Sequence, residues 1–379
     1  MTEVARPQTA QATAAVLAQA AAGGRSVRIV GGGTKQAWGA AASEPAVTLE
    51  TGRLDRILEH NAGDLTAVLE AGVPLARAQA AFASTGQMLA LDPPLGDDQA
   101  ATIGGVIATA DSGPLRHRYG GPRDLVIGIT VALSDGTVAR AGGKVIKNVA
   151  GYDLAKLFTG SFGTLGAIVS VNVRLHPRPH ASATASGASA DPALLATAAR
   201  ALAAAPLELE ALDVAWRDGW GALLARAGGA RPEHQARRAA ALLREEGLER
   251  VDVTSEDAPL WERQRAGQRS PGRALVRVAT RPSALAEVLR AAGDCGAAVV
   301  GRAALGTSYV ELDPDAVAAL RERLPDVRAA VLLDGPVALR RAQDPWEAPE
   351  GRALELMRRV KRSFDPAGTC NPGSFVGGI

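Results

Sequence analysis

The hydrophobic and polar positions divide the chain into two regions of different texture. In the first region, short apolar runs bounded by turn residues predict strands at 27–30, 48–50, 66–70, 125–133, 137–140 and 167–175. Helices are expected over 8–22 and from Pro74 to Ser84, because proline suits the first turn of a helix. From residue 191 onward, amphipathic segments alternate with short apolar runs, which is typical of a separate α+β domain.

The second region has its own set of expected elements. Helices are predicted at 191–204, 231–246, 281–293 and 314–324, and strands at 207–214, 251–254, 274–280, 297–300, 309–312 and 330–333. An Ala/Ser stretch at 181–190 is either a linker or a polar edge strand, a final helix is expected over 350–364, and no internal repeat is visible. We therefore expect domains at 1–177 and 178–345, with residues 346–379 returning to the first.

The composition is that of a globular protein, with 379 residues of which 47% are hydrophobic and 22% charged. The net charge of +2 argues against nucleic acid as a partner. The only cysteines, Cys295 and Cys370, are too few to hold an iron–sulfur cluster, which usually needs four. No secretory or membrane-spanning pattern is present, so we expect a cytoplasmic protein with at most peripheral attachment to the inner face of the membrane.

The chain has 42 glycines, and many of them occur in clusters. Gly31, Gly32 and Gly33 follow an expected strand, and successive glycine amides there can form a concave nest for an anion such as pyrophosphate. The spacing is not that of a Walker A loop, and Gln36 stands where a dinucleotide fingerprint needs glycine. A tight turn without a ligand is the alternative interpretation.

A second cluster, residues 102–113, is dominated by small side chains. Such a run permits a flat ligand to approach the backbone closely. Ile103, Val106 and Ile107 favour a helix packed on one side over a flexible loop. The basic residues Arg116 and Arg118 that follow either face an anion or are solvated.

These parts, in this order, resemble the FAD-binding domain of the vanillyl-alcohol oxidase/p-cresol methylhydroxylase family. The resemblance rests on residues 31–35, 101–113, 118–124, 151–154, 163–166 and the tail 364–373. It implies an α+β fold, in which a two-subdomain FAD-binding domain of the p-cresol methylhydroxylase type precedes a smaller α+β cap domain with an antiparallel sheet. The tail then returns to the flavin.

The resemblance also implies which residues contact FAD. They are Gly31, Gly32, Gly33, Thr34, Lys35, Thr102, Gly104, Gly105, Thr109, Ser112, Gly113, Tyr119, Asp124, Gly163, Gly166, Ile168 and Asn371. Some members attach the flavin through a histidine where this chain has Thr34 and Lys35, so we expect non-covalent FAD. Many members have glutamate where this chain has Phe162.

The substrate side is less well equipped. Oxidising a 2-hydroxy acid needs a base for the hydroxyl proton, a role that suits histidine. No histidine follows His234, so a histidine-based metal site is not expected in the second domain, and no metal is predicted. The catalytic residues are not identified; Arg116, His117 and Tyr119 are candidates.

Within the family, the chain is most similar to FAD-binding subunits of glycolate oxidases. That likeness implies a complex with a second flavin-type catalytic subunit and an iron–sulfur subunit, acting on a small 2-hydroxy acid such as glycolate. The alternatives are a self-sufficient FAD-dependent 2-hydroxy-acid oxidoreductase and a structural subunit with a non-catalytic flavin site. Four tryptophans could be interface anchors or core residues: Trp216, Trp220, Trp261 and Trp346.

Overall fold

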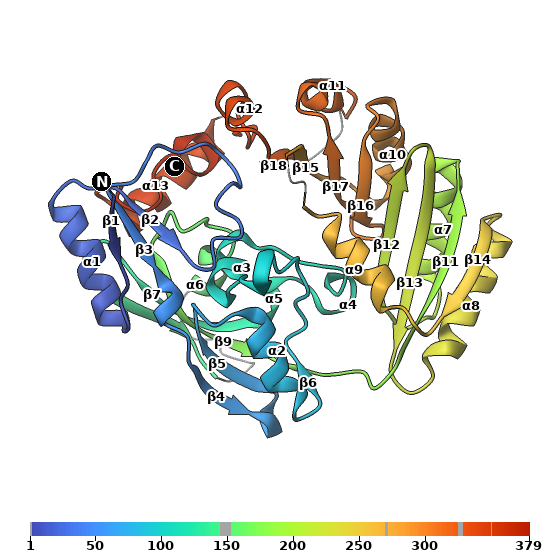
Figure 1. Cartoon of the computed structure of the whole chain (residues 1–379), viewed down its shortest axis with the longest axis horizontal. Coiled ribbons are helices and arrows are strands. Elements are labelled where there is room, and N and C mark those ends of the chain that lie inside the picture. Colours follow the sequence, from blue (N-terminus) through green and yellow to red (C-terminus); the bar gives the residue numbers. More distant parts are fainter. Residues whose placement is uncertain (1, 145–152, 270–271, 325–328, 350) are drawn as a thin grey trace. The chain divides into compact units, whose positions relative to one another are not determined.

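The structure is a computed structural model that describes residues 2–144, 153–269, 272–324, 329–349 and 351–379 (Figure 1). The chain divides into two compact units. The first unit comprises Met1–Ser112, Gly120–Arg178 and Ala348–Ile379, and the second comprises Gly113–Tyr119 and Pro179–Glu347. Gly151 and Tyr152, which belong to one of the sequence motifs, lie outside the described residues.

The described residues of the first unit form three small sheets. A parallel sheet has the order β1 (Glu3–Ala5), β3 (Val47–Glu50), β2 (Val27–Val30). An antiparallel sheet has the order β4 (Ile57–Asn61), β5 (Thr66–Glu70), β9 (Ala167–Arg174), β7 (Val126–Ala132), β8 (Val138–Gly142). The third is the pair β10 (His176–Pro177) and β6 (Gln87–Met88).

The helices of the first unit pack on these sheets. They are α1 (Ala10–Ala22), α2 (Leu75–Ala83), α3 (Ile103–Thr109), α5 (Pro122–Leu125), α6 (Leu154–Phe158) and α13 (Arg352–Phe364). One buried cluster joins Leu17 of α1, Leu49 of the parallel sheet and Val169 of the antiparallel sheet. This shared core fixes the end of β2, from which the first glycine loop starts.

The second unit is built on one eight-stranded sheet in which every pair is antiparallel. Its order is β14 (Glu249–Thr254), β11 (Ser182–Ser189), β13 (Trp220–Gly228), β12 (Leu209–Arg217), β16 (Ala298–Arg302), β17 (Thr307–Leu312), β15 (Ala274–Ala279), β18 (Ala329–Asp334). The unit's helices are α4 (Arg116–Tyr119), α7 (Pro192–Ala204), α8 (Pro232–Glu245), α9 (Ala258–Ala266), α10 (Leu285–Asp294), α11 (Val317–Glu322) and α12 (Val337–Ala342). The predicted fold class, an FAD-binding α+β domain followed by an α+β domain with an antiparallel sheet, is confirmed.

The connectivity of the large sheet repeats, although the sequence shows no repeat. Elements β11-α7-β12-β13-α8-β14 and then β15-α10-β16-β17-α11-β18 each follow the βαββαβ order of a ferredoxin-like unit. The two halves join where β12 pairs with β16. What repeats is the order of elements rather than the residues, so the sequence carries no visible period.

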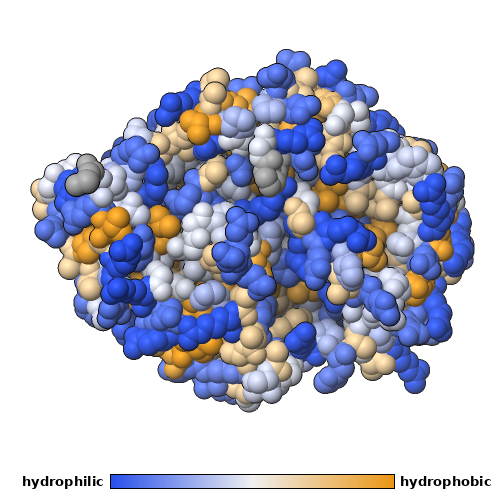
Figure 2. Space-filling view, in the orientation of Figure 1, coloured by the Kyte–Doolittle hydropathy of each residue, from blue (hydrophilic) through white to orange (hydrophobic). Residues whose placement is uncertain are grey.

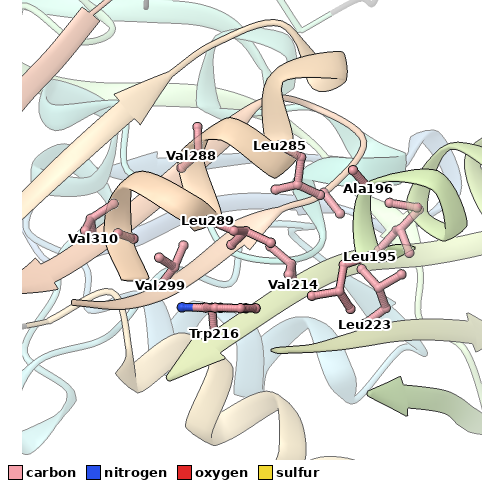
Figure 3. Packing of buried hydrophobic residues seen from close by; sticks show 14 of the residues in the cluster. Leu195, Ala196, Val214, Trp216, Leu223, Leu285, Val288, Leu289, Val299 and Val310 are labelled. Atoms are coloured by element: carbon pink, nitrogen blue, oxygen red, sulfur yellow. The ribbon is translucent and has the colours of Figure 1, made fainter. Parts of the chain in front are cut away.

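The main core of this unit lies between the sheet and the helices on one of its faces (Figure 3). Val214, Leu223 and Val299 point from the strands toward Leu289 of α10 and Leu195 of α7. Each of these side chains is buried. The alternation of side chains along each strand leaves a second face, on which polar residues gather.

Three of the four tryptophans are core residues in the structure, since Trp216, Trp261 and Trp346 are at most 6% exposed. Trp220, at the start of β13, is 40% exposed. On the face of the molecule seen in Figure 2, hydrophobic residues form separate small patches among hydrophilic ones. Of the interface candidates, Trp220 alone keeps an accessible ring.

Two sequence expectations about the large sheet need correction. The stretch at 181–190 is neither a linker nor an edge strand, because β11 pairs with β13 on one side and β14 on the other. Its small residues alternate, with Ala183 and Ala185 in the core and Thr184 on the second face. Strand β13 was not expected, since its alanines and glycines carry a weak apolar signal.

Candidate cofactor-binding site

The first glycine loop is shaped by contact with another loop. A Cβ atom on Gly31 would overlap the Thr102 hydroxyl, and one on Gly32 would overlap the Ala100 carbonyl. Gly33 has φ of +73° and faces open space. Within the described part of the chain, no residue accepts a hydrogen bond from the backbone amides of these three glycines. Three unpaired donors at the end of a strand form an arrangement that suits an anion.

The second cluster is helix α3 with Thr102 as its N-cap, whose Oγ1 accepts a 3.3 Å hydrogen bond from the Gly105 amide. The Thr109 hydroxyl donates to the Gly105 carbonyl at 2.8 Å. A Cβ on Gly104 would lie 2.7 Å from the Cβ of Ala71. The small residues here therefore allow the helix to pack closely on the neighbouring backbone. The predicted helix is confirmed, while cofactor contact by these residues stays a prediction.

An ion pair links the two clusters. Lys35 Nζ lies 3.3 Å from Asp111 Oδ2, and the two side chains are 6% and 0% exposed. The ammonium group also stands 5.7 Å above the centre of the Trp38 ring. Neither carboxylate oxygen of Asp111 accepts a hydrogen bond from any described residue. Sequence reasoning missed Asp111 and Trp38 as site residues, although a buried charge beside a glycine loop needs a counterion.

The third cluster runs beside the end of α3. The Gly160 amide donates to the Ile107 carbonyl at 3.0 Å, and the Phe162 amide donates to the Ala108 carbonyl at 2.8 Å. Gly163 has φ of +71°, and a Cβ there would lie 2.8 Å from the side-chain nitrogen Nδ2 of Asn371. Its lack of a side chain therefore makes room for the chain's own tail.

The two other predicted contacts of this cluster lie at the strand that follows. A Cβ on Gly166 would lie 2.6 Å from the Ala132 carbonyl. Ile168 is 6% exposed and pairs with Val131 in the antiparallel sheet. Both positions are thus set by contacts within the protein.

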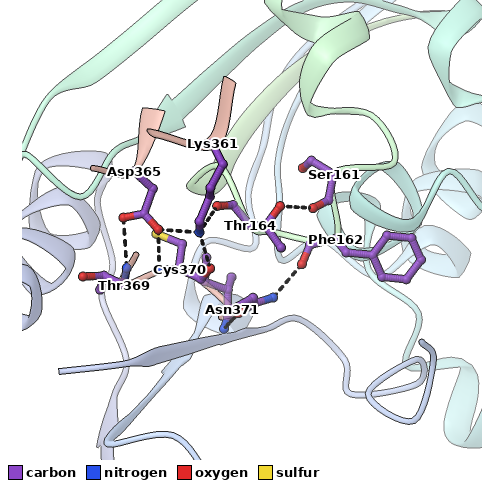
Figure 4. Close-up of polar contacts among 9 residues, drawn as sticks. Ser161, Phe162, Thr164, Lys361, Asp365, Thr369, Cys370 and Asn371 are labelled. Atoms are coloured by element: carbon purple, nitrogen blue, oxygen red, sulfur yellow. Dashed lines mark hydrogen bonds and ion pairs between the residues drawn. The ribbon is translucent and has the colours of Figure 1, made fainter. Parts of the chain in front are cut away.

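The tail is tied to this loop by a set of charged and amide groups (Figure 4). Asn371 accepts a hydrogen bond from the Ile29 amide at 2.8 Å and donates to the Phe162 carbonyl at 2.6 Å. It thereby bridges β2, just before the first glycine loop, and the third cluster. Lys361 Nζ donates to the carbonyls of Thr164 and Cys370 at 2.6 and 2.9 Å.

Asp365 completes this tail clamp, which we define as Lys361, Asp365 and Asn371. Asp365 Oδ2 lies 2.6 Å from Lys361 Nζ, and the carboxylate accepts from the amides of Thr369 and Cys370. Burial opposes its charge, but these partners outweigh burial and hold the pKa of Asp365 below its usual range. Burial raises the pKa of the Cys370 thiol to about 12, so that thiol stays protonated.

The candidate catalytic residues belong to the second unit. Tyr119, at the end of α4, donates to Glu210 Oε1 on β12 at 2.9 Å. Burial and the Glu210 carboxylate raise the pKa of Tyr119 far above its usual value. Burial lowers the pKa of His117, and no described residue hydrogen-bonds its Nδ1. Arg116 opens the same short helix.

Three further predicted contacts flank α4 in the sequence. Asp124 accepts from the Gly121 amide at 2.8 Å and so caps α5. Ser112 is the buried last residue of its segment in the first unit, and Gly113 opens the segment that belongs to the second.

The polar face of the large sheet holds a network that sequence reasoning missed. Arg302 of β16 is 1% exposed and bonds both Asp213 of β12 and Gln268. Burial raises the pKa of Asp213 to about 6, although the Arg302 charge opposes that rise. Asp257 accepts from Thr184 at 2.8 Å and lies 3.2 Å from Arg226. These residues are far apart in the sequence, so they form no motif that sequence analysis could detect.

Two sequence families match the chain. Residues 2–142 match the family described as "FAD binding domain", and residues 346–375 match "FAD linked oxidases, C-terminal domain". Both segments of this chain are therefore similar to FAD-binding, FAD-linked oxidases. Its two matched segments are the ones that the tail clamp joins.

Three comparisons relate this chain to known proteins. It is 40% identical over 126 residues to "Glycolate oxidase subunit GlcE" of Escherichia coli (strain K12), a match spanning 33% of this chain and 36% of that subunit. It is 26% identical to an "Uncharacterized FAD-linked oxidoreductase" of Mycobacterium tuberculosis, over 98% of this chain and 90% of that protein. A structure of alkyldihydroxyacetonephosphate synthase shares the fold, with a TM-score of 0.73 at 15% identity, covering 98% of this chain and 77% of that one.

The residues of the first unit fit FAD. The unpaired amides of Gly31–Gly33 and the Lys35 ammonium suit its pyrophosphate, since both donate hydrogen bonds to anions. Asp111 Oδ1, which accepts no hydrogen bond from a described residue, suits a ribityl or ribose hydroxyl, which needs an acceptor. Within the described residues, no cluster of histidine, cysteine or acidic side chains could hold a metal ion. Nor is any described helix long and apolar enough to cross a membrane.

Proposed function

We propose that this chain is the FAD-binding subunit of a glycolate or related 2-hydroxy-acid dehydrogenase complex. It would hold FAD non-covalently and work beside a second flavin-type catalytic subunit and an iron–sulfur subunit. The 40% identity to a glycolate oxidase subunit over 126 residues supports this proposal. FAD supplies the redox chemistry when bound, because it accepts two electrons from a substrate and can release them singly.

The residues of the first unit have defined tasks in this proposal. The amides of Gly31–Gly33 bind the cofactor's phosphates, and Lys35 neutralises part of their charge. Asn371 of the tail clamp holds the first glycine loop and the third cluster together. Thr34 and Lys35 offer no histidine for a covalent bond, and Lys35 is paired with Asp111.

The protonation state of Tyr119 is the observation that favours a complex over a self-sufficient enzyme. Its hydroxyl donates to Glu210, and its pKa is raised, so near neutral pH it keeps its proton and is no base. The two cysteines cannot hold an iron–sulfur cluster, so clusters would sit on a partner chain.

A specific observation favours the self-sufficient oxidoreductase as the second candidate. Burial lowers the pKa of His117, so its imidazole is neutral near pH 7 and can accept a proton. If His117 were to act as the base, a 2-hydroxy acid would transfer its hydroxyl proton to this ring.

Purification of the chain alone distinguishes these functions. We expect a yellow protein that releases its flavin on acid precipitation and is not bleached by glycolate. Addition of the flavin-type and iron–sulfur subunits should restore glycolate-dependent reduction of an artificial acceptor. Bleaching by glycolate without partners would establish the second candidate. A colourless chain that still assembles would indicate a structural subunit.

A further inference from the structure

A pocket of about 660 Å³ opens on the second unit, and the described residues that line it all belong to that unit. Its floor consists of small side chains from three adjacent strands: Ala215 of β12, Ala222 of β13 and Ala298 of β16. All three alternate with residues of the main core, so they lie on the face of the sheet opposite α7 and α10. Because alanine extends only to Cβ, the floor stays low where larger residues would fill the space.

The walls of the pocket are apolar side chains. Leu224 of β13 and Leu260 of α9 line it, and the exposed ring of Trp220 stands at its rim. Arg250 places its guanidinium 4.8 Å from the centre of the Trp220 ring. A large aromatic ring that remains 40% exposed beside a hollow is an anchor point for a ligand.

The charges around the pocket are mostly positive. Four arginines line it (Arg217, Arg250, Arg263 and Arg269), against a single carboxylate, Glu311. Glu311 is already neutralised, because Arg217 lies 3.7 Å and Arg273 3.4 Å from its oxygens. Within the described residues, neither Arg250 nor Arg263 has a carboxylate partner. Two arginines thus remain available to an anion.

We propose that this pocket binds an organic anion with an extended apolar or aromatic body. The body would lie on the alanine floor beside Trp220, and its carboxylate, sulfonate or phosphate would meet Arg250 and Arg263. Pockets of 300–1,000 Å³ typically take ligands of drug size, so the volume suits a body larger than a two-carbon hydroxy acid.

A pair of matched fluorescent probes tests the proposal without any measurement of turnover. We expect 8-anilino-1-naphthalenesulfonate to bind one site per chain and to quench Trp220 by energy transfer. N-phenyl-1-naphthylamine has the same body without the sulfonate, and it should bind about tenfold more weakly, since one charged contact is worth about that factor. Equal affinity for the two probes would contradict the anion preference.

Variants separate the floor from the charges. Arg250→Gln with Arg263→Gln should weaken the sulfonate probe about tenfold and leave the neutral probe unchanged. The matched control is Arg238→Gln with Arg290→Gln, two exposed arginines on α8 and α10. Ala222→Leu should block both probes by filling the hollow. The proposal is overturned if the control and the arginine pair behave alike, or if neither probe binds. A failure of both probes combined with lost subunit association in the arginine pair would instead mark a protein docking surface.

Discussion

The two units differ in which polar groups form their candidate sites. In the first, the site is made mainly of backbone: the amides of Gly31–Gly33 donate to no described residue, and Asn371 binds main-chain groups of two loops. In the second, it is made of side chains, such as Arg302 and Asp213, which distant strands bring together. A backbone site leaves a trace in sequence because it demands glycine at fixed positions. A side-chain site leaves none.

The largest expected effect on cofactor binding comes from adding a side chain to the backbone site. Gly32→Val should lower FAD affinity at least about 100-fold, because its Cβ would overlap the Ala100 carbonyl and push the loop away. Titration of apoprotein with FAD, followed by flavin fluorescence, measures this. The matched control is Gly52→Ala, whose Cβ would meet no atom within 4 Å. Unchanged affinity in Gly32→Val would place the phosphates elsewhere.

A substitution in the tail clamp tests whether the C-terminal segment stabilises the two loops. Lys361→Met should cost about 3–5 kcal/mol of unfolding free energy, because it strands the buried Asp365 carboxylate. Lys156→Met is the control, since its pair with Asp153 is about half exposed and worth at most about 1 kcal/mol. Urea unfolding of both variants gives the comparison. Equal losses would mean that the clamp is not what fixes the tail.

The buried charge of the second unit makes its stability depend on pH. The folded pKa of Asp213 is about 6, above its ordinary value of 3.8, so the folded state binds this proton more tightly than the unfolded state. Its contribution is therefore fully present below pH ~4 and is lost as pH rises through 6, by about 3 kcal/mol. Relative to Asp213→Asn, the parent should therefore lose about 3 kcal/mol of unfolding free energy between pH ~3 and pH ~7, of which about 2 kcal/mol falls between pH 4 and 6. Asp252→Asn, an exposed carboxylate on β14, should give a flat difference.

The contrast between the units explains how much the sequence could predict. Gly31–Lys35, Thr102 and Gly163 stand out by residue type and spacing, and the structure brings all of them to one region of the first unit. Asp111 was overlooked because its partner Lys35 is 76 positions away, and only the fold shows that both are buried.

In the second unit, the features that the sequence does not reveal depend on which distant strands pair with each other. The weakly apolar alanines and serines of residues 181–190 predict a linker or a polar edge strand, yet β11 within this stretch is paired on both sides. Arg302 and Asp213 are 89 positions apart and meet only because β12 pairs with β16. Hydrophobic patterning predicts that such strands exist, but it does not predict their order.

The smallest expected effect is also the one that separates the two candidate functions. Tyr119→Phe removes the hydroxyl that donates to Glu210, which should cost about 1–2 kcal/mol because Glu210 is buried and loses one donor. If the chain acts as a subunit whose partner performs substrate chemistry, turnover of the assembled complex stays within about threefold of the parent for Tyr119→Phe and for His117→Gln. If His117 is the base in this chain, His117→Gln alone should lower turnover about 100-fold, the usual contribution of a general base. Steady-state rates of both variants with glycolate, at matched flavin content, show whether the second unit takes part in substrate oxidation or whether the partner subunit performs it.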